Sequence, residues 1–301
     1  MTTFAQQAAT FLAEGTSRAK KPFRPNTIKN YKSQIETIIN PLIGDKPMED
    51  VGNKLLKEVC LELQEQDYSA KSIGDILNLI KQIVKSAVNS EGDFLYPREW
   101  NAKFIDAPSV EGQKQPTISA QSLQDALSKA LCARKALYAI LAGSGLRISE
   151  ALAIHYGPDN GITSYWIPQE SKVIVRQQRN GKDFGPTKTK AGVREVDLAP
   201  ELNEFLKATF PQTVNTYLLF PGGISTYAED LKEIGIEGGF HTLRRFRISH
   251  LQSVSVPGML IKFWNGHAAG DITERYTKVG SEIQARKEQA AKAGLGFKLD
   301  S

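Results

Sequence analysis

The chain has 301 residues, which at about 100–200 residues per domain predicts two domains. Apolar residues make up 41% and charged residues 24%, so the composition is globular and excludes a fibrous or largely disordered chain. A net charge of +5 suits a polyanionic partner such as nucleic acid, although many proteins with other functions carry a similar charge.

The cellular compartment follows from what the sequence lacks. Cys60 and Cys132 are far apart and form no CxxC pattern, which argues against a disulfide framework or a structural zinc site. The first residues have no basic segment followed by an apolar block, so we expect no signal peptide. No apolar run reaches about 18 residues, so we expect no membrane-spanning helix. These features together predict a cytoplasmic protein.

The first third of the chain is predicted to be helical. Apolar residues at helical spacing indicate helices over residues 4–11, 26–40, 55–63 and 69–88. Asn26 is a suitable N-cap for the second of these helices, which Pro41 and Gly44 should end. We expect residues 1–106 to form one helical domain.

A linker is predicted over residues 107–119, which contain two prolines, one glycine and few apolar residues. Ser119 can cap the helix that follows. Residues 120–301 then form the second domain.

The second domain mixes helices and strands. Helices are expected over residues 123–141, ending at Gly143 and Gly145, and over residues 148–154. Strand-like runs cover residues 162–168, 171–178 and 193–198, and the last two flank a long turn segment rich in Gly, Lys and Thr. Helices return after Pro200. The predicted fold class is therefore mainly α with a small antiparallel β-sheet (α+β).

Six residues of the second domain stand out as a set. Each alone has an ordinary explanation, such as a surface arginine, a solvated loop lysine or a packed tyrosine. His241 and Arg244 are one helical turn apart, so their side chains share a face. The six are Arg147, Lys188, His241, Arg244, His267 and Tyr276.

Cleavage of a phosphodiester gives this combination a chemical meaning. Two arginines can hold the non-bridging oxygens as forks, and removal of one such donor typically costs on the order of 100–1000-fold in rate. Histidine can hydrogen-bond the phosphate or accept a proton, and lysine can protonate the leaving oxygen. A tyrosine phenol can act as a covalent nucleophile. No metal is required for this chemistry, and the sequence has neither a clustered Asp/Glu set nor a P-loop.

The local strings around these residues resemble the tyrosine recombinases, or phage integrases. GSGLRISEALAI resembles the first-arginine box of that family, KTKAGVREV its β-hairpin lysine, and HTLRRF its His-x-x-Arg box. NGHAAGDITERYT resembles the Gly-His box followed by the nucleophile. NTIKNYKSQIETIINPLIG resembles the core-binding domain that precedes such catalytic domains. The resemblance covers roughly residues 4 to 280.

The resemblance implies a helical, SAM-like core-binding domain followed by a catalytic domain, together forming a clamp around a specific site on double-stranded DNA. Tyr276 would form a 3′-phosphotyrosyl link, Arg147 and Arg244 would hold the phosphate, and His241 and His267 would assist. Lys188 would be the general acid. The reaction would use no metal and no other cofactor, including ATP, and strand exchange implies a homotetramer on DNA. The C-terminal tail is expected to form a helix that could dock on a neighbouring protomer.

Two residues depart from the pattern of the family. Asp197 stands where proline is common, and Asn265 stands where leucine is frequent. The lysine assignment also has alternatives, because Lys182 and Lys190 lie close to Lys188 in the sequence.

Other functions remain open at this point. One is a DNA-binding protein on the same scaffold that does not cleave, and another is a type IB topoisomerase. A zinc hydrolase using His241 and His267 is a further alternative, but the sequence offers no third ligand at metal-site spacing. The sequence does not distinguish integration, dimer resolution and cassette exchange, nor does it give the DNA site. Phosphate contacts are predicted for Lys20, Lys21, Lys29 and Lys32 of the first domain.

Overall fold

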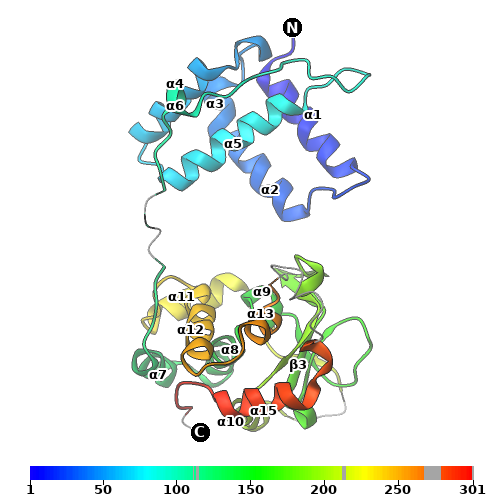
Figure 1. Ribbon diagram of the computed structural model, residues 1–301, viewed down its shortest axis with the longest axis vertical. Coiled ribbons are helices and arrows are strands. Elements are labelled where there is room, and N and C mark those ends of the chain that lie inside the picture. Colours follow the sequence, from blue (N-terminus) through cyan, green and yellow to red (C-terminus); the bar gives the residue numbers. More distant parts are fainter. Residues whose placement is uncertain (111, 113–114, 212–214, 268–278, 300–301) are drawn as a thin grey trace. The chain divides into compact units, whose positions relative to one another are not determined.

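The computed structural model describes residues 1–110, 112, 115–211, 215–267 and 279–299 (Figure 1). By internal contacts the chain divides into two compact units, Met1–Gln113 and Lys114–Ser301. Each has its own hydrophobic core. We describe the two units separately.

The described part of the N-terminal unit is a helical bundle. Its core is formed by aliphatic side chains from several helices together with Phe4 and Phe11. A π-helical turn, Ile35–Ile39, joins the second helix to the third. The helices are α1 (Phe4–Ser17), α2 (Pro25–Gln34), α3 (Asn40–Ile43), α4 (Asn53–Glu65), α5 (Ala70–Ser86) and α6 (Ala102–Ile105).

The helix starts of this unit follow local chemistry, with one departure from the prediction. The hydroxyl of Thr3 accepts the backbone N–H of Gln6, whose side chain accepts the Thr3 N–H in return, which completes a capping box. Asn26 was the wrong choice of cap for α2. Arg24 occupies the N-cap position and Pro25 is the first helical residue, where its missing N–H costs nothing.

The C-terminal unit combines helices with two small sheets. Its helices are α7 (Ala120–Lys129), α8 (Cys132–Ser144), α9 (Ile148–Ala151), α10 (Pro200–Thr209), α11 (Ile224–Glu233), α12 (Phe240–Ser253), α13 (Gly258–Asn265) and α15 (Ile283–Ala293). Its strands are β1 (Ile154–Tyr156), β2 (Ser164–Ile167), β3 (Lys172–Val175), β4 (Gln177–Asn180), β5 (Asp183–Pro186), β6 (Arg194–Asp197) and β7 (Tyr217–Leu218).

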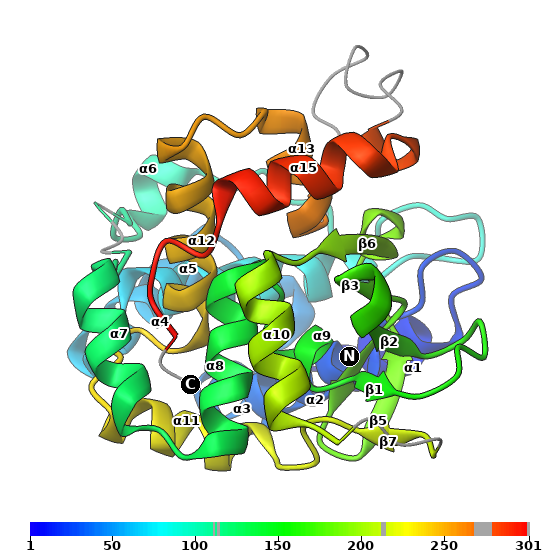
Figure 2. The ribbon, with the colours of Figure 1, turned by 90° about the horizontal axis from the view of Figure 1, so that it is seen from below.

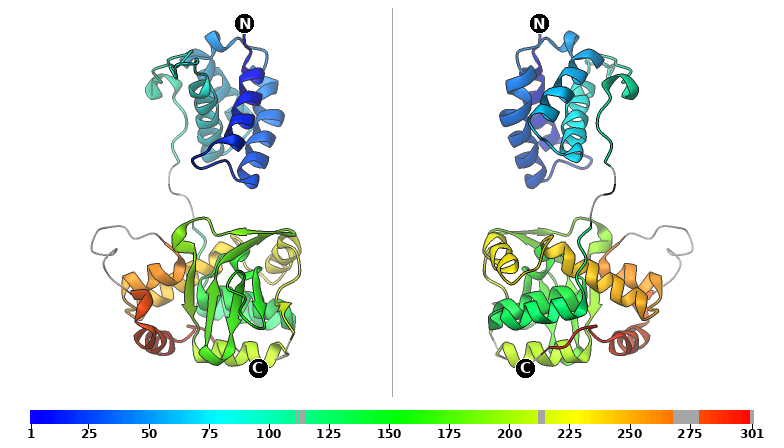
Figure 3. Two further views of the ribbon diagram at one scale, coloured as in Figure 1. Left: turned by 90° about the vertical axis from the view of Figure 1, so that its right-hand side faces the viewer. Right: turned by 90° about the vertical axis from the view of Figure 1, so that its left-hand side faces the viewer.

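The larger sheet has five strands in the order β6-β3-β2-β1-β7. Figure 3 shows the strands of this unit in green, packed against helices. The pairs β2–β3, β3–β6 and β1–β7 are antiparallel, whereas β1 and β2 run parallel. The predicted fold class, mainly α with a small sheet, is confirmed. The sheet is mixed rather than purely antiparallel, because β1, which the sequence pattern did not indicate, pairs in parallel with β2. The other additional strand, β7, pairs antiparallel with β1.

The second sheet is the hairpin β4–β5, which lies inside the segment predicted to be a turn. Asn180 and Asp183 face each other across a two-residue turn, and Gly181 adopts a positive φ of 64° there. A glycine adopts this conformation without steric cost. In the sequence the hairpin lies between β3 and β6 and leads into the loop that carries Lys188.

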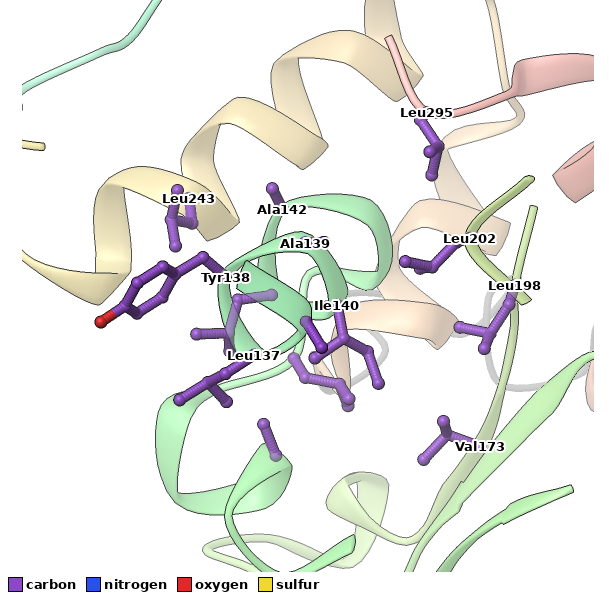
Figure 4. Close-up of a cluster of buried hydrophobic side chains, with 14 of the residues drawn as sticks. Leu137, Tyr138, Ala139, Ile140, Ala142, Val173, Leu198, Leu202, Leu243 and Leu295 are labelled. Carbon is purple, nitrogen blue, oxygen red and sulfur yellow. The ribbon is translucent and has the colours of Figure 1, made fainter. Parts of the chain in front are cut away.

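Helix α8 forms the centre of the C-terminal core. Its residues from Ala136 to Ser144 are all buried, as expected for a helix with neighbours on every side (Figure 4). Leu202 of α10, Leu243 of α12 and Val173 of β3 pack around it.

Two predicted helices of this unit differ in extent from those observed. The single helix predicted over residues 123–141 is two helices, because the chain leaves α7 at Ala130 and restarts at Cys132. Ser119 caps α7 as expected, accepting the backbone N–H of Ser122. The helix predicted over residues 148–154 is also shorter, since it ends at Ala151 and gives way to β1.

The C-terminal helix α15 packs on its own unit, against β6 (Figure 2). Arg286 of α15 donates through Nε to Asp197 of β6 at 2.9 Å, and both side chains are buried. The predicted helix in the tail is thus present, and its partner within this chain is β6. Within the described ranges, no helix has the length and apolar character that a membrane span requires.

Candidate active site

The first-arginine string places Arg147 between two helices. Gly145 ends α8 in the left-handed conformation, with φ 73°, and Arg147 is the N-cap of α9. A Cβ at Gly145 would lie 2.7 Å from Oδ1 of Asn265. Glycine is therefore needed there both for the backbone angle and for the close approach of α13.

Glu150 holds Arg147 at this helix start. Its carboxylate accepts the Arg147 backbone N–H at 3.0 Å and the Arg147 Nη1 at 2.9 Å. Burial acts to raise the pKa of the Glu150 carboxyl, but hydrogen bonds and charge from Arg194, with further help from Arg147, hold that pKa below its usual value. Glu150 is thus a buried anion that orients a partly exposed guanidinium.

Arg194 is the partner of Glu150 that the sequence reading missed. Its Nη1 and Nη2 donate to the two oxygens of Glu150 at 3.2 and 3.0 Å, and both side chains are buried. One signal was present in the sequence, because Arg194 is two residues before the core residue Val196 in a predicted strand. Alternation places residues i and i+2 on the same face, here the buried one.

Arg244 of α12 is buried and bonded to the neighbouring segments through its guanidinium. Nη1 donates to the Gly145 carbonyl at 2.6 Å, and Nη2 donates to the Asn265 carbonyl at 2.6 Å and to Nε2 of His267 at 2.9 Å. Burial, followed by the charge of Arg147, lowers the pKa of Arg244 to about 10. The group is still protonated at neutral pH.

His267 follows Gly266, a position where both the backbone angle and a close neighbour favour glycine. Gly266 has φ 61°, and a Cβ there would lie 2.8 Å from Nη1 of Arg194. Because a guanidinium only donates, Nε2 of His267 must accept from Arg244, which leaves the proton of the neutral ring on Nδ1. Burial and the charge of Arg244 lower the pKa of His267, so the ring is neutral at neutral pH.

His241 and Lys188 lie near the same cluster. His241 is one turn before Arg244 on α12, and its exposed side chain has a lowered pKa because of partial burial and the charges of several cations. Lys188 is one of the cations whose charge lowers that pKa. The loop that carries Lys188 has an internal hydrogen bond, in which the Thr187 hydroxyl donates to the Thr189 carbonyl at 2.9 Å.

The structure thus gathers five of the six predicted residues, namely Arg147, Lys188, His241, Arg244 and His267. Tyr276 lies outside the described residues. Lys20, Lys21, Lys29 and Lys32 are all exposed in the N-terminal unit, and Lys32 forms an i,i+4 pair with Glu36.

The two departures from the family pattern have structural partners. Asp197 accepts the indole N–H of Trp264 at 2.8 Å in addition to Arg286. The side-chain amide N–H of Asn265 donates to the Ile261 backbone carbonyl, and the backbone carbonyl of Asn265 accepts from Arg244. Both residues are buried and tie α13 to the rest of the site.

The arrangement combines two arginines with two neutral imidazoles and one exposed lysine. Such a set can bind the anionic oxygens of a phosphate, and the neutral ring of His241 can accept a proton. Over the residues that the structure describes, no group of three or more His, Cys, Asp or Glu side chains forms a candidate metal site.

Comparisons with known proteins find similar folds among solved structures only. No protein-family model matches the chain, and no curated protein matches it. Among solved structures, the Tn1549 transposon integrase in complex with circular intermediate DNA is 17% identical, with 96% of this chain and 99% of that chain covered and a TM-score of 0.67.

Lambda integrase is similar over nearly the same extent. A dimer bound to a COC′ core site is 15% identical, with 97% of this chain and 98% of that chain covered and a TM-score of 0.58. A lambda integrase tetramer bound to a Holliday junction is 13% identical, with 93% and 80% covered and a TM-score of 0.58. The chain therefore has the fold of these integrases, which are tyrosine recombinases.

Proposed function

We propose that the chain is a site-specific DNA recombinase that cuts and rejoins duplex DNA through a covalent link to Tyr276. The observation that carries the proposal is the hydrogen bond between Arg244 and His267, made beside Arg147 in a cluster of cations and neutral imidazoles. The fold shared with DNA-bound integrases supports the same conclusion.

In the proposed reaction, the phenol oxygen of Tyr276 attacks the scissile phosphorus. The phenol proton passes to a neutral imidazole, for which His241 is the candidate because its pKa is lowered. The bond from phosphorus to the 5′-oxygen breaks, and Lys188 protonates that oxygen. Arg147 and Arg244 stabilise the charge on the non-bridging oxygens throughout.

Rejoining reverses these steps with a different 5′-hydroxyl. Because the phosphotyrosyl bond conserves the energy of the phosphodiester, the reaction needs neither ATP nor a metal. Exchange of strands between two duplexes requires four cleavages, so the active species would be a homotetramer on DNA. The N-terminal unit would contribute phosphate contacts from the exposed lysines of α2 and the loop before it.

The experiment is a search for covalent protein–DNA adducts in EDTA. Purified protein is incubated with supercoiled plasmids carrying DNA from the borders of its own genetic element, and the reaction is stopped with denaturant. We expect an adduct from the wild-type protein and none from Tyr276→Phe. Tyr217→Phe is the matched control, because Tyr217 is half-buried and its hydroxyl donates to the Pro211 carbonyl.

The outcomes separate the proposal from its alternatives. An adduct that persists in Tyr276→Phe would refute the assignment of the nucleophile. Relaxation of any supercoiled plasmid without site preference would indicate a type IB topoisomerase. Tight, specific binding of border DNA with no adduct would indicate a binding protein on this scaffold.

A further inference from the structure

Arg194 touches three of the chain segments that carry the clustered residues, those of Arg147, Lys188 and His267. Besides the two bonds to Glu150, Nη1 donates to the Gly192 carbonyl at 2.9 Å and Nε donates to the Trp264 carbonyl at 2.7 Å. Glu150 belongs to the helix that begins at Arg147. Gly192 ends the loop of Lys188, and Trp264 is three residues before His267.

The side chain is held too tightly to be an incidental ion pair. It is buried, with 1% of its area exposed, and its guanidinium meets two anionic oxygens and two carbonyls at hydrogen-bond distance. Gly266 packs directly above it, since a Cβ there would lie 2.8 Å from Nη1. A rigid planar fork can join several acceptors at fixed angles, which the single ammonium of lysine cannot do.

We propose that Arg194 is the positioning residue of this site. It sets the Arg147 guanidinium through Glu150 and fixes the two loops that present Lys188 and His267. Arg194 itself is covered by protein and touches no substrate. Its catalytic contribution rests on the proposed function, whereas its role in joining the segments does not.

Hydrogen–deuterium exchange tests the positioning role without any activity. In Arg194→Met, we expect faster exchange in peptides covering residues 145–151, 187–193 and 264–267 together. Arg134→Met is the matched control, because Arg134 also pairs with a buried carboxylate, that of Asp230, away from the cluster. That control should accelerate exchange around residues 134–138 and 227–231 only. Unchanged exchange in any one of the three peptides would overturn the proposal.

Kinetics then test the catalytic consequence. In Arg194→Met the rate of adduct formation at saturating DNA should fall by about 100-fold, which is the usual effect of losing one charge-stabilising donor. The DNA concentration that gives half of the maximal rate should change little. Arg194→Lys should recover part of the rate, because it restores the charge opposite Glu150. If Arg194→Met folds and forms adduct as fast as Arg134→Met does, Arg194 contributes to stability alone.

A second variant guards against loss of folding. Arg194→Met leaves Glu150 buried with Arg147 as its remaining cation, whereas Glu150→Gln/Arg194→Met removes the buried charge as well. The double variant should unfold at a higher temperature than Arg194→Met and still form adduct slowly. A double variant with the wild-type rate would overturn the proposal.

If the wild-type protein forms no adduct on its border DNA, the proposed function is refuted. The hydrogen–deuterium exchange result then decides the role of Arg194 by itself.

Discussion

Arg286 and Asp197 form a buried ion pair, with Nε and Oδ2 2.9 Å apart, that fastens helix α15 to strand β6. The same carboxylate accepts the indole N–H of Trp264, so one anion joins strand β6, helix α13 and helix α15. The helix that follows residues 268–278 is therefore anchored to the strand that carries Arg194.

Removal of one partner from this pair should destabilise the C-terminal unit strongly. Arg286→Met leaves the Asp197 carboxylate buried with an indole as its remaining donor, and such losses typically cost about 3–5 kcal/mol. Calorimetry should show a lower melting temperature for the transition of this unit and little change for the N-terminal unit. A shift no larger than that of Lys207→Met, which breaks the exposed pair with Glu204, would contradict this expectation.

The ends of helix α13 provide a matched pair of glycine substitutions. Gly266→Ala should lower the free energy of unfolding by at least about 1–2 kcal/mol, the usual cost of a left-handed residue, with the contact to Arg194 in addition. Gly258→Ala should be neutral or stabilising by up to about 1 kcal/mol, since no atom lies within 4 Å of its added Cβ. Urea unfolding of both variants measures the difference, and equal effects would refute the argument from geometry.

Much of the fold was predictable because local signals were strong. The apolar spacing of α5 and the capping serine of α7 belong to single segments of sequence, and both predictions hold. The parallel pairing of β1 with β2 depends on contacts between segments. Short strands such as β7, with two residues, are too brief to show a period.

The site was predictable where chemistry restricts the residue type. Bidentate binding of phosphate favours arginine, and two arginines in recognisable strings led to Arg147 and Arg244, which the structure places in one cluster. Arg194 escaped notice because a charged residue in a strand usually faces solvent. Its role depends on Glu150, 44 residues away, and on Trp264, 70 residues away. Only the folded chain brings these groups together.

Acid should weaken both stability and activity through the histidines. The pKa values of His241 and His267 are lowered from the ordinary value of 6.5, so the unfolded chain binds more protons in acid. Their stabilising contribution is present above pH 6.5 and is lost as the pH falls through the lowered values. Protonated His267 also loses the lone pair that accepts from Arg244.

The comparison of His267→Gln with wild type between pH 5 and 7.5 checks this prediction. A glutamine keeps an acceptor oxygen but does not titrate, so its melting temperature should depend less on pH in that window. An identical pH dependence in the two proteins would show that His267 does not contribute to it.

The exposed lysines of the N-terminal unit should act through counterion release. If Lys20, Lys21, Lys29 and Lys32 contact phosphates, each change to Gln should lower the slope of log binding constant against log salt by about one. Lys71→Gln is the control, because Lys71 is exposed on α5 and pairs with Asp75. An unchanged slope for any of the four removes that residue from the DNA interface.

The proton donor of the proposed reaction can be identified by changing the leaving group. Lys188→Ala should slow adduct formation by about 100–10,000-fold on ordinary DNA, the range for loss of a general acid. A substrate with sulfur at the 5′-bridging position should restore the rate, because a thiolate, with a thiol pKa of about 8.5, leaves without protonation.

Two neighbouring lysines serve as controls for this assignment. Lys182 lies in the turn of the β4–β5 hairpin and Lys190 begins the turn after Lys188, and both are exposed. Their alanine variants should cleave ordinary DNA at nearly the wild-type rate. If Lys190→Ala instead showed the loss and the rescue by sulfur, the proton donor would be Lys190. A loss in Lys188→Ala that sulfur does not restore would place Lys188 with the arginines, as a phosphate contact rather than a proton donor.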